Sequence, residues 1–155
     1  MVSGGETKNL SKLVENLKKK WSKTGPSLDQ KTQNSIFELL DQCDDFLIEL
    51  DIFPEEITSQ NVELVLLARE IMEIGAHFSI LIQDFQQFES YYAKLNTYYF
   101  QYNELLESSP YMLEMIALHL MNLLSNNLIT DFLQIIMVTK QINLLEKGIK
   151  LFEES

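Results

Sequence analysis

The chain has 155 residues, about the size of one domain, and this length is enough to bury a core without metals or cross-links. Its hydrophobic content of 46% argues against global disorder, and five Gly and three Pro are too few for the many turns of a β-sandwich or barrel. The formal net charge of −11 disfavours nucleic acid and anionic membranes as partners and favours basic protein surfaces.

The first predicted helix carries a regular apolar stripe. Its apolar residues repeat at the i, i+3, i+4, i+7 spacing of one helix face: Leu10, Leu13, Val14 and Leu17. Residues 1–8 are predicted to be a flexible leader, and the helix is expected to end near Trp21. Half of the twelve basic residues lie in this N-terminal region: Lys8, Lys12, Lys18, Lys19, Lys20 and Lys23. The rest of the chain is therefore strongly acidic.

A second helix is predicted after Gly25 and Pro26, which break the chain, and Ser27 is placed as its N-terminal cap. Its inner stripe has heptad spacing: Ile36, Leu40, Cys43, Leu47 and Leu50. The opposite side carries an acidic residue every fourth position: Asp41, Asp45 and Glu49. This side is expected to be a solvated outer face, or alternatively a contact for a basic partner.

The third predicted helix is expected to begin at Thr58 or Ser59, after Pro54 has ended the second. It is apolar on two sides, through Leu64, Val65, Leu67, Ala68, Ile71, Met72, Ile74 and Phe78. Such a helix must lie between neighbours. Gly75 and Ala76 predict a close helix crossing, because small residues let two backbones approach and glycine otherwise weakens a helix.

A fourth helix, capped by Asp84, has an aromatic inner side. The residues predicted to face inward are Phe85, Phe88, Tyr92, Leu95 and Tyr99. Ser109, followed by proline, marks the start of a fifth helix that runs to residue 124. A sixth helix is predicted near residues 129–138, and a short seventh over 141–153.

The predicted helices form pairs. The third and fourth are expected to make one hairpin, and the fifth and sixth another. Pairs stacked side by side, each burying the face of the last, define an α-solenoid. We therefore predict an all-α helical repeat of about six to seven antiparallel helices over residues 9–139, with a C-terminal helix or tail over 140–155. This architecture offers extended surface for binding other proteins.

The residues that best fit a metal site are Glu70, Glu73 and His77, since Glu73 and His77 stand four residues apart on one helix. A di-metal bundle needs further acids and a second such motif on a facing helix. Cys43 lies on a buried stripe, where a thiol is inert. The chain has no Gly-rich phosphate loop, no Gly-x-Ser-x-Gly elbow and no Cys-x-x-Cys pair. We predict no enzyme activity, no catalytic or cofactor-binding residues, no metal and no small-molecule substrate.

The compartment is predicted from the single cysteine, Cys43, which cannot form an internal disulfide, and from the absence of a signal-peptide pattern at the N-terminus. The most apolar stretch, residues 111–138, is interrupted by polar residues too often for a membrane span. These observations predict a protein of the cytoplasm or nucleus.

A cluster of aromatic residues around the end of the fourth helix is the best candidate for a partner surface, together with the acidic side of the second helix. The candidate residues are Tyr91, Tyr98, Tyr99, Phe100, Tyr102, Asp41, Asp45 and Glu49. The aromatics of one helix cannot all face one core, and tyrosine is common at interaction hot spots. The alternative is an aromatic core between adjacent hairpins.

Three segments of the chain resemble a known family. They are LVLLAREIMEIGAHFSIL at residues 64–81, FESYYAKLNTYYFQY at 88–102 and SSPYMLEMIALHLMNLLSNN at 108–127. The resemblance is to the PCI-family subunits in the lid of the 26S proteasome regulatory particle, and it covers roughly residues 13–132. The family implies a tetratricopeptide-like repeat that leads into a winged helix, without enzymatic activity or cofactor. It also implies other lid subunits as partners in ubiquitin-dependent protein degradation, in cytoplasm and nucleus.

Individual positions carry this resemblance. Those that match the family's central repeat helix are Ile71, Glu73, Ile74, Gly75 and Ala76, and those that match the next helix are Phe88, Tyr98, Tyr99 and Phe100. After Phe132 the chain departs from the family pattern, and the winged helix is expected to be absent. Two alternatives stay open. One is a subunit of a related PCI complex, the signalosome or translation initiation factor three, and the other is a metal-binding helical-bundle enzyme that uses Glu70, Glu73 and His77.

Overall fold

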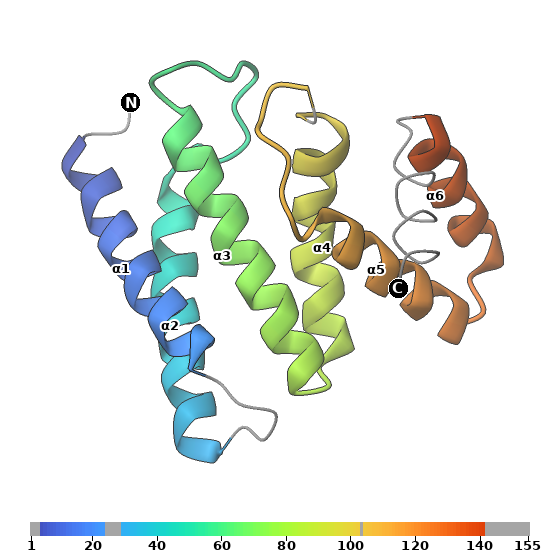
Figure 1. Ribbon diagram of the computed structural model, residues 1–155, viewed down its shortest axis with the longest axis horizontal. Helices are drawn as coiled ribbons and strands as arrows, with labels where there is room; N and C mark the ends of the chain where they lie inside the picture. Colours follow the sequence, from blue (N-terminus) through green and yellow to red (C-terminus); the bar gives the residue numbers. More distant parts are fainter. Residues whose placement is uncertain (1–3, 24–28, 103, 142–155) are drawn as a thin grey trace. The chain divides into compact units, whose positions relative to one another are not determined.

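The computed structural model describes residues 4–23, 29–102 and 104–141, and over these residues the chain contains helices and no strands (Figure 1). The six helices in these ranges are α1 (Gly4–Ser22), α2 (Gln30–Glu49), α3 (Val62–Leu81), α4 (Phe85–Phe100), α5 (Met112–Ser125) and α6 (Ile129–Gln141). The chain divides into two compact units, with α1 to α4 in the first and α5 and α6 in the second. The prediction of an all-α helical repeat is confirmed. In this part of the chain, none of the helices is both long and apolar enough to cross a bilayer.

The first unit consists of two helix pairs. Helix α1 packs against α2, and α3 packs against both of them as well as against α4. Figure 1 shows α3 in the middle of the unit, between α1 and α4. Because the second pair covers a face of the first, the two pairs share one core, which is the packing principle of helical repeats.

Helix α1 begins at Gly4, so the predicted leader over residues 1–8 is wrong from position 4 onward. Glycine weakens a helix, and positions 4 and 5 are both glycine. Tertiary packing overrides this local preference, because the predicted stripe residues Leu10, Val14 and Leu17 are buried and anchor the helix.

Helix α2 is capped by Asp29, whose Oδ1 accepts a hydrogen bond from the Thr32 N–H at 2.7 Å. Hydrogen bonds from Thr32 lower the pKa of Asp29 below its ordinary value, which keeps the cap ionised. Ser27, the predicted cap, lies outside the described residues. The inner stripe is buried as predicted at Ile36, Leu40, Cys43 and Leu47. The helix ends at Glu49, several residues before Pro54.

Helix α3 begins at Val62 and not at Thr58 or Ser59 as predicted. Residues 58–61 instead form a separate turn, in which the Thr58 N–H donates to Asn61 Oδ1 at 2.8 Å. The Val62 N–H donates to the Thr58 carbonyl oxygen at 3.0 Å. Every residue from 71 to 76 is buried, as expected of a helix that lies between neighbours.

The connection from α3 to α4 is short and includes Gln83, whose φ of 62° places it in the left-handed region. Asp84 caps α4 as predicted, because its Oδ1 accepts a hydrogen bond from the Gln87 N–H at 3.1 Å. Phe85 was predicted to face inward, but its side chain is 50% exposed. It lies in the first turn of α4, at the end of the hairpin, where α3 has already ended.

The second unit is the α5–α6 pair. Between the two helices Asn127 adopts a φ of 62°, a conformation that asparagine tolerates better than most residues. Ser109, the predicted cap, acts in the turn before α5: its Oγ accepts a hydrogen bond from the Tyr111 N–H at 3.1 Å. The predicted seventh helix falls almost entirely beyond residue 141, outside the described residues.

Candidate interaction surface

The four tyrosines proposed from the sequence as a partner surface are buried. Tyr91, Tyr98, Tyr99 and Tyr102 are each at most 5% exposed, and Phe100 is half-buried. A buried side chain cannot touch a partner, so the structure favours the alternative, an aromatic core. These tyrosines are buried because α3 and the segment before α3 cover this side of α4.

The hydroxyl groups of these tyrosines link α4 to the rest of the first unit. Tyr91 donates to Asp44 Oδ2 on α2 at 3.0 Å, and Tyr99 donates to the Glu73 carboxylate on α3. Tyr98 and Tyr102 each donate, at 2.5 Å, to a backbone carbonyl of the α2–α3 connection, the first to Ile52 and the second to Pro54. The spacing of the tyrosines along the sequence carried no signal for these acceptors, because each lies more than twenty residues away.

Raising the pH above about 10 is expected to destabilise the first unit. Burial raises the pKa of Tyr98 and Tyr99 above the ordinary tyrosine value, so both hydroxyls ionise first in the unfolded chain. When folding raises the pKa of a group, its contribution to stability is fully present at a pH below the pKa in the unfolded chain. The contribution is lost as the pH rises from that value toward the pKa in the folded chain. The free energy of unfolding, measured by denaturant titration, should be nearly level to about pH 9 and then fall. A level value up to about pH 11 would contradict the burial of these hydroxyls.

Gly75 lies directly under the ring of Tyr91. A Cβ atom added to Gly75 would come within 2.5 Å of Tyr91 Cζ, a distance that real side chains do not adopt. Ala76 is fully buried on the same helix. The absence of a side chain at Gly75 therefore lets the aromatic ring of α4 approach the backbone of α3, and we propose that this is why position 75 is glycine.

The three side chains considered for a metal site make contacts with different neighbours. Glu70 forms an ion pair with Lys18 at 3.0 Å, Glu73 accepts the Tyr99 hydroxyl, and His77 stacks on Trp21 with ring centroids 6.2 Å apart. Among the described residues, no three His, Cys, Asp or Glu side chains come close enough to hold a metal ion together. The groups instead join α3 to α1 and α4.

Cys43 is expected to react slowly with alkylating reagents in the folded chain. It is fully buried, and burial raises the pKa of its thiol to about 12. Because only the thiolate attacks, the rate with iodoacetamide at pH 8 should be roughly a thousand-fold below that of the chain in concentrated guanidinium. Equal rates in the two conditions would mean that the inner stripe of α2 is open to solvent.

The acidic side of α2 is solvent-exposed, as a partner contact requires. Its carboxylates are exposed at Glu38, Asp41, Asp45 and Glu49. Two large apolar side chains share this side: Phe37 is 52% exposed and Ile48 is 81% exposed. We call these six residues the α2 outer face. The spacing of the acidic residues did not identify Phe37 and Ile48, although each directly follows a residue of the buried stripe and so points away from it.

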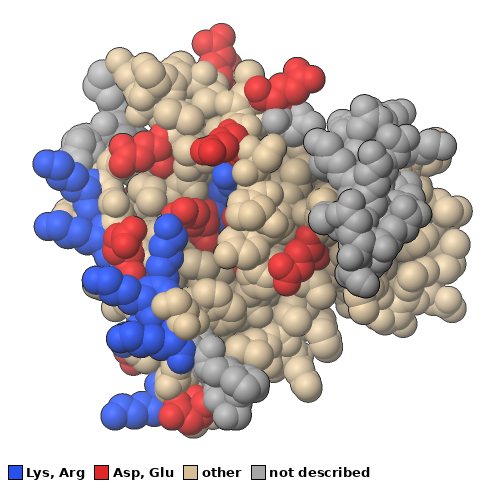
Figure 2. Space-filling model, in the orientation of Figure 1, with Lys and Arg blue, Asp and Glu red and all other residues tan. Residues whose placement is uncertain are grey.

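The basic residues gather on a different helix. In and just after α1, the exposed lysines are Lys8, Lys12, Lys19, Lys20 and Lys23. Figure 2 shows basic side chains gathered over α1, along one edge of the first unit. Acidic groups are spread over the remaining visible surface of the first unit. The first unit therefore has a basic helix and an acidic helix next to each other, with different kinds of partner favoured by each.

The fold and these surfaces define an all-α helical-repeat protein made of stacked helix pairs, with charged groups on its outer helix faces. Within that class, the chain is similar to the 26S proteasome regulatory subunit RPN12 of Saccharomyces cerevisiae. The two are 32% identical over 111 residues, which make up 70% of this chain and 38% of the yeast subunit. The chain thus spans well under half of that relative. No protein-family model matches the chain. The resemblance to a proteasome regulatory subunit, predicted from the three segments, is confirmed.

Proposed function

We propose that the chain is a non-catalytic scaffold of the 26S proteasome regulatory-particle lid and supports ubiquitin-dependent protein degradation through contacts with other lid subunits. The observation that carries the proposal is the 32% identity over 111 residues to a yeast proteasome regulatory subunit. The same relationship supports a location in the cytoplasm and nucleus, where proteasomes work.

The arrangement of polar groups in the first unit supports a scaffold. The buried carboxylate of Glu73 and the half-buried carboxylate of Asp44 join helices, because each accepts a tyrosine hydroxyl from α4. Its one cysteine is buried with a raised pKa, which leaves no reactive thiolate. The groups that remain free to meet other molecules are the charged and apolar side chains of the outer helix faces.

Affinity purification tests this function directly. The tagged chain is expressed in yeast cells, and the proteins that co-purify are identified by mass spectrometry. The expected result is recovery of proteasome regulatory subunits. The matched control is the Gly75→Leu variant, which keeps the surface of the first unit but should damage its core and recover fewer of them. Recovery of another helical-repeat complex, such as translation initiation factor three, without proteasome subunits would contradict the proposal.

A further inference from the structure

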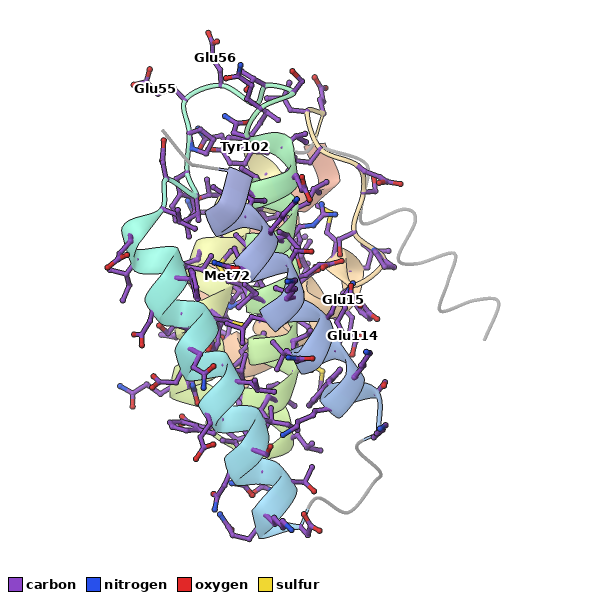
Figure 3. All side chains as sticks on the ribbon, turned by 90° about the vertical axis from the view of Figure 1, so that its left-hand side faces the viewer. Glu15, Glu55, Glu56, Met72, Tyr102 and Glu114 are labelled. Atoms are coloured by element: carbon purple, nitrogen blue, oxygen red, sulfur yellow. The ribbon has the colours of Figure 1, made fainter. Side chains whose placement is uncertain are left out.

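The α2 outer face combines acidic groups with exposed apolar groups along one line of the helix. Phe37 and Ile48 are eleven residues apart, which corresponds to about three turns or roughly 16 Å of helix. Asp41 and Asp45 lie between them along the helix and next to them around it, and Glu38 and Glu49 lie further round on the same side as Asp45. In Figure 3 the side of α2 away from the other helices carries side chains that extend into solvent.

The rest of the first unit leaves this face uncovered. Helices α1 and α3 pack on α2, and Tyr91 of α4 contacts it at Asp44. The buried residues of α2 are the inner stripe from Ile36 to Leu47. Within the described ranges, no lysine or arginine forms an ion pair with the four carboxylates of the face. Lys31, in the first turn, is the one basic residue of α2.

The carboxylates of the face also act on a neighbour. Asp44 lies beside the face and is held by the Tyr91 hydroxyl at 3.0 Å. Burial raises the pKa of Asp44, the Tyr91 hydrogen bond and Lys94 lower it, and the negative charges of Asp41 and Asp45 raise it to a smaller extent. Like charges therefore crowd this part of α2, and a cation placed against the face would relieve their repulsion.

We propose that the α2 outer face binds an amphipathic helix of a partner protein, whose contact side carries lysine or arginine between two apolar side chains. Charge complementarity selects the basic residues, and Phe37 and Ile48 select the apolar residues at either end. The acidic groups repel phosphate, which disfavours nucleic acid and anionic lipid at this face. The inference rests on the proposed function, because it specifies the kind of surface through which the chain would join its complex.

A designed peptide tests the chemistry of the face. The probe is an alanine-rich helical peptide with two leucines eleven residues apart and lysines on the same side between them. Binding to the full chain is measured by fluorescence anisotropy over a range of salt concentrations. We expect saturable binding that weakens as salt increases. The same peptide with glutamate in place of lysine, and the one with alanine in place of both leucines, should each bind at least about tenfold more weakly. Equal binding of all three peptides would overturn the proposal.

Matched variants of the chain locate the binding. Asp41→Lys with Asp45→Lys changes the charge of the face, and Glu55→Lys with Glu56→Lys makes the same change in net charge at the α2–α3 connection. Figure 3 shows Glu55 and Glu56 projecting at one end of the molecule, away from the middle of α2. The first pair of substitutions should weaken binding of the lysine peptide about tenfold or more, and the second pair less than about twofold. Ile48→Ser, at a side chain 81% exposed, should weaken it without affecting the fold, which circular dichroism checks. If both double variants lost the same affinity for the peptide, the effect would come from the net charge of the chain, and the assignment to this face would be overturned.

Two further outcomes separate this inference from the proposed function. If the wild-type chain co-purifies with proteasome subunits and the Asp41→Lys, Asp45→Lys variant does so equally well, the docking face is wrong and the function stands. If the peptides bind as expected but no proteasome subunit is captured, the function fails and the face remains. A second copy of the chain is the competing occupant, through its basic α1. A dimer in sedimentation that the same double variant dissociates would overturn the proposal in favour of that occupant.

Discussion

Replacing Gly75 by leucine is expected to lower the free energy of unfolding of the first unit by about 3 kcal/mol or more. Even a methyl group at this position would meet Tyr91 Cζ at 2.5 Å and both Cε atoms at 2.8 Å. The ring cannot easily withdraw, because it is buried and its hydroxyl is bonded to Asp44. Gly75→Ala should show the same sign with a smaller loss of about 1 kcal/mol, since the better helix propensity of alanine, about 1 kcal/mol, offsets part of the overpacking.

The measurement can follow the first unit alone. Trp21 is the one tryptophan of the chain and stacks on His77 of α3, so its fluorescence during denaturant titration reports the packing of α1 on α3. The control is Ala93→Leu, which adds the same side chain at an exposed position of α4 and should change the stability by less than about 0.5 kcal/mol. Tyr91→Phe frees the ring from Asp44 and should therefore reduce the penalty of Gly75→Ala. An unchanged unfolding midpoint for Gly75→Leu would mean that α3 and α4 do not approach each other at this residue.

The sequence predicted those parts of the fold that depend on local periodicity. The stripe of α2 and the two apolar sides of α3 are periodic patterns, and the residues they identified are buried except Leu50 and Leu67, which are half-buried. The Asp84 cap was also predicted correctly, because an N-terminal cap depends only on the capping residue and the helix that follows it. The start of α1 was missed because helix formation at Gly4 depends on packing further along the helix, which overrides the local weakness of glycine.

The site was less predictable because it depends on which residues meet across the fold. The four tyrosines could be assigned to a surface or to a core with equal justification, since their acceptors lie on other elements. The acidic side of α2 was identified from the spacing of Asp41, Asp45 and Glu49 alone. Its two apolar members were not, because a hydrophobic residue in a sequence is normally assumed to be buried, and only the packed structure shows Ile48 left in solvent.

Removing the Tyr99 hydroxyl is expected to cost about 2 kcal/mol of stability, because it takes a donor from the buried carboxylate of Glu73. Glu73 is only 4% exposed, so water cannot replace the lost hydrogen bond without rearrangement. Glu73→Met should also destabilise the unit, because it leaves the buried Tyr99 hydroxyl without this acceptor. The double variant, Tyr99→Phe with Glu73→Met, should lose much less stability than the sum of the two single losses. With both partners replaced by apolar groups, neither a hydroxyl nor a carboxylate of this pair is left buried without its hydrogen bond.

A double-mutant cycle on Tyr99→Phe and Glu73→Met, followed by Trp21 fluorescence, should therefore give a coupling free energy of about 1–3 kcal/mol. Tyr98→Phe is the matched control, because it removes a buried hydroxyl one residue away that donates to the Ile52 carbonyl oxygen and not to Glu73. Its effect should add to that of Glu73→Met within about 0.5 kcal/mol. If Tyr98 and Tyr99 couple to Glu73 equally, the hydroxyl–carboxylate bond is not what joins α3 to α4, and the loss would instead reflect a general loosening of the aromatic core.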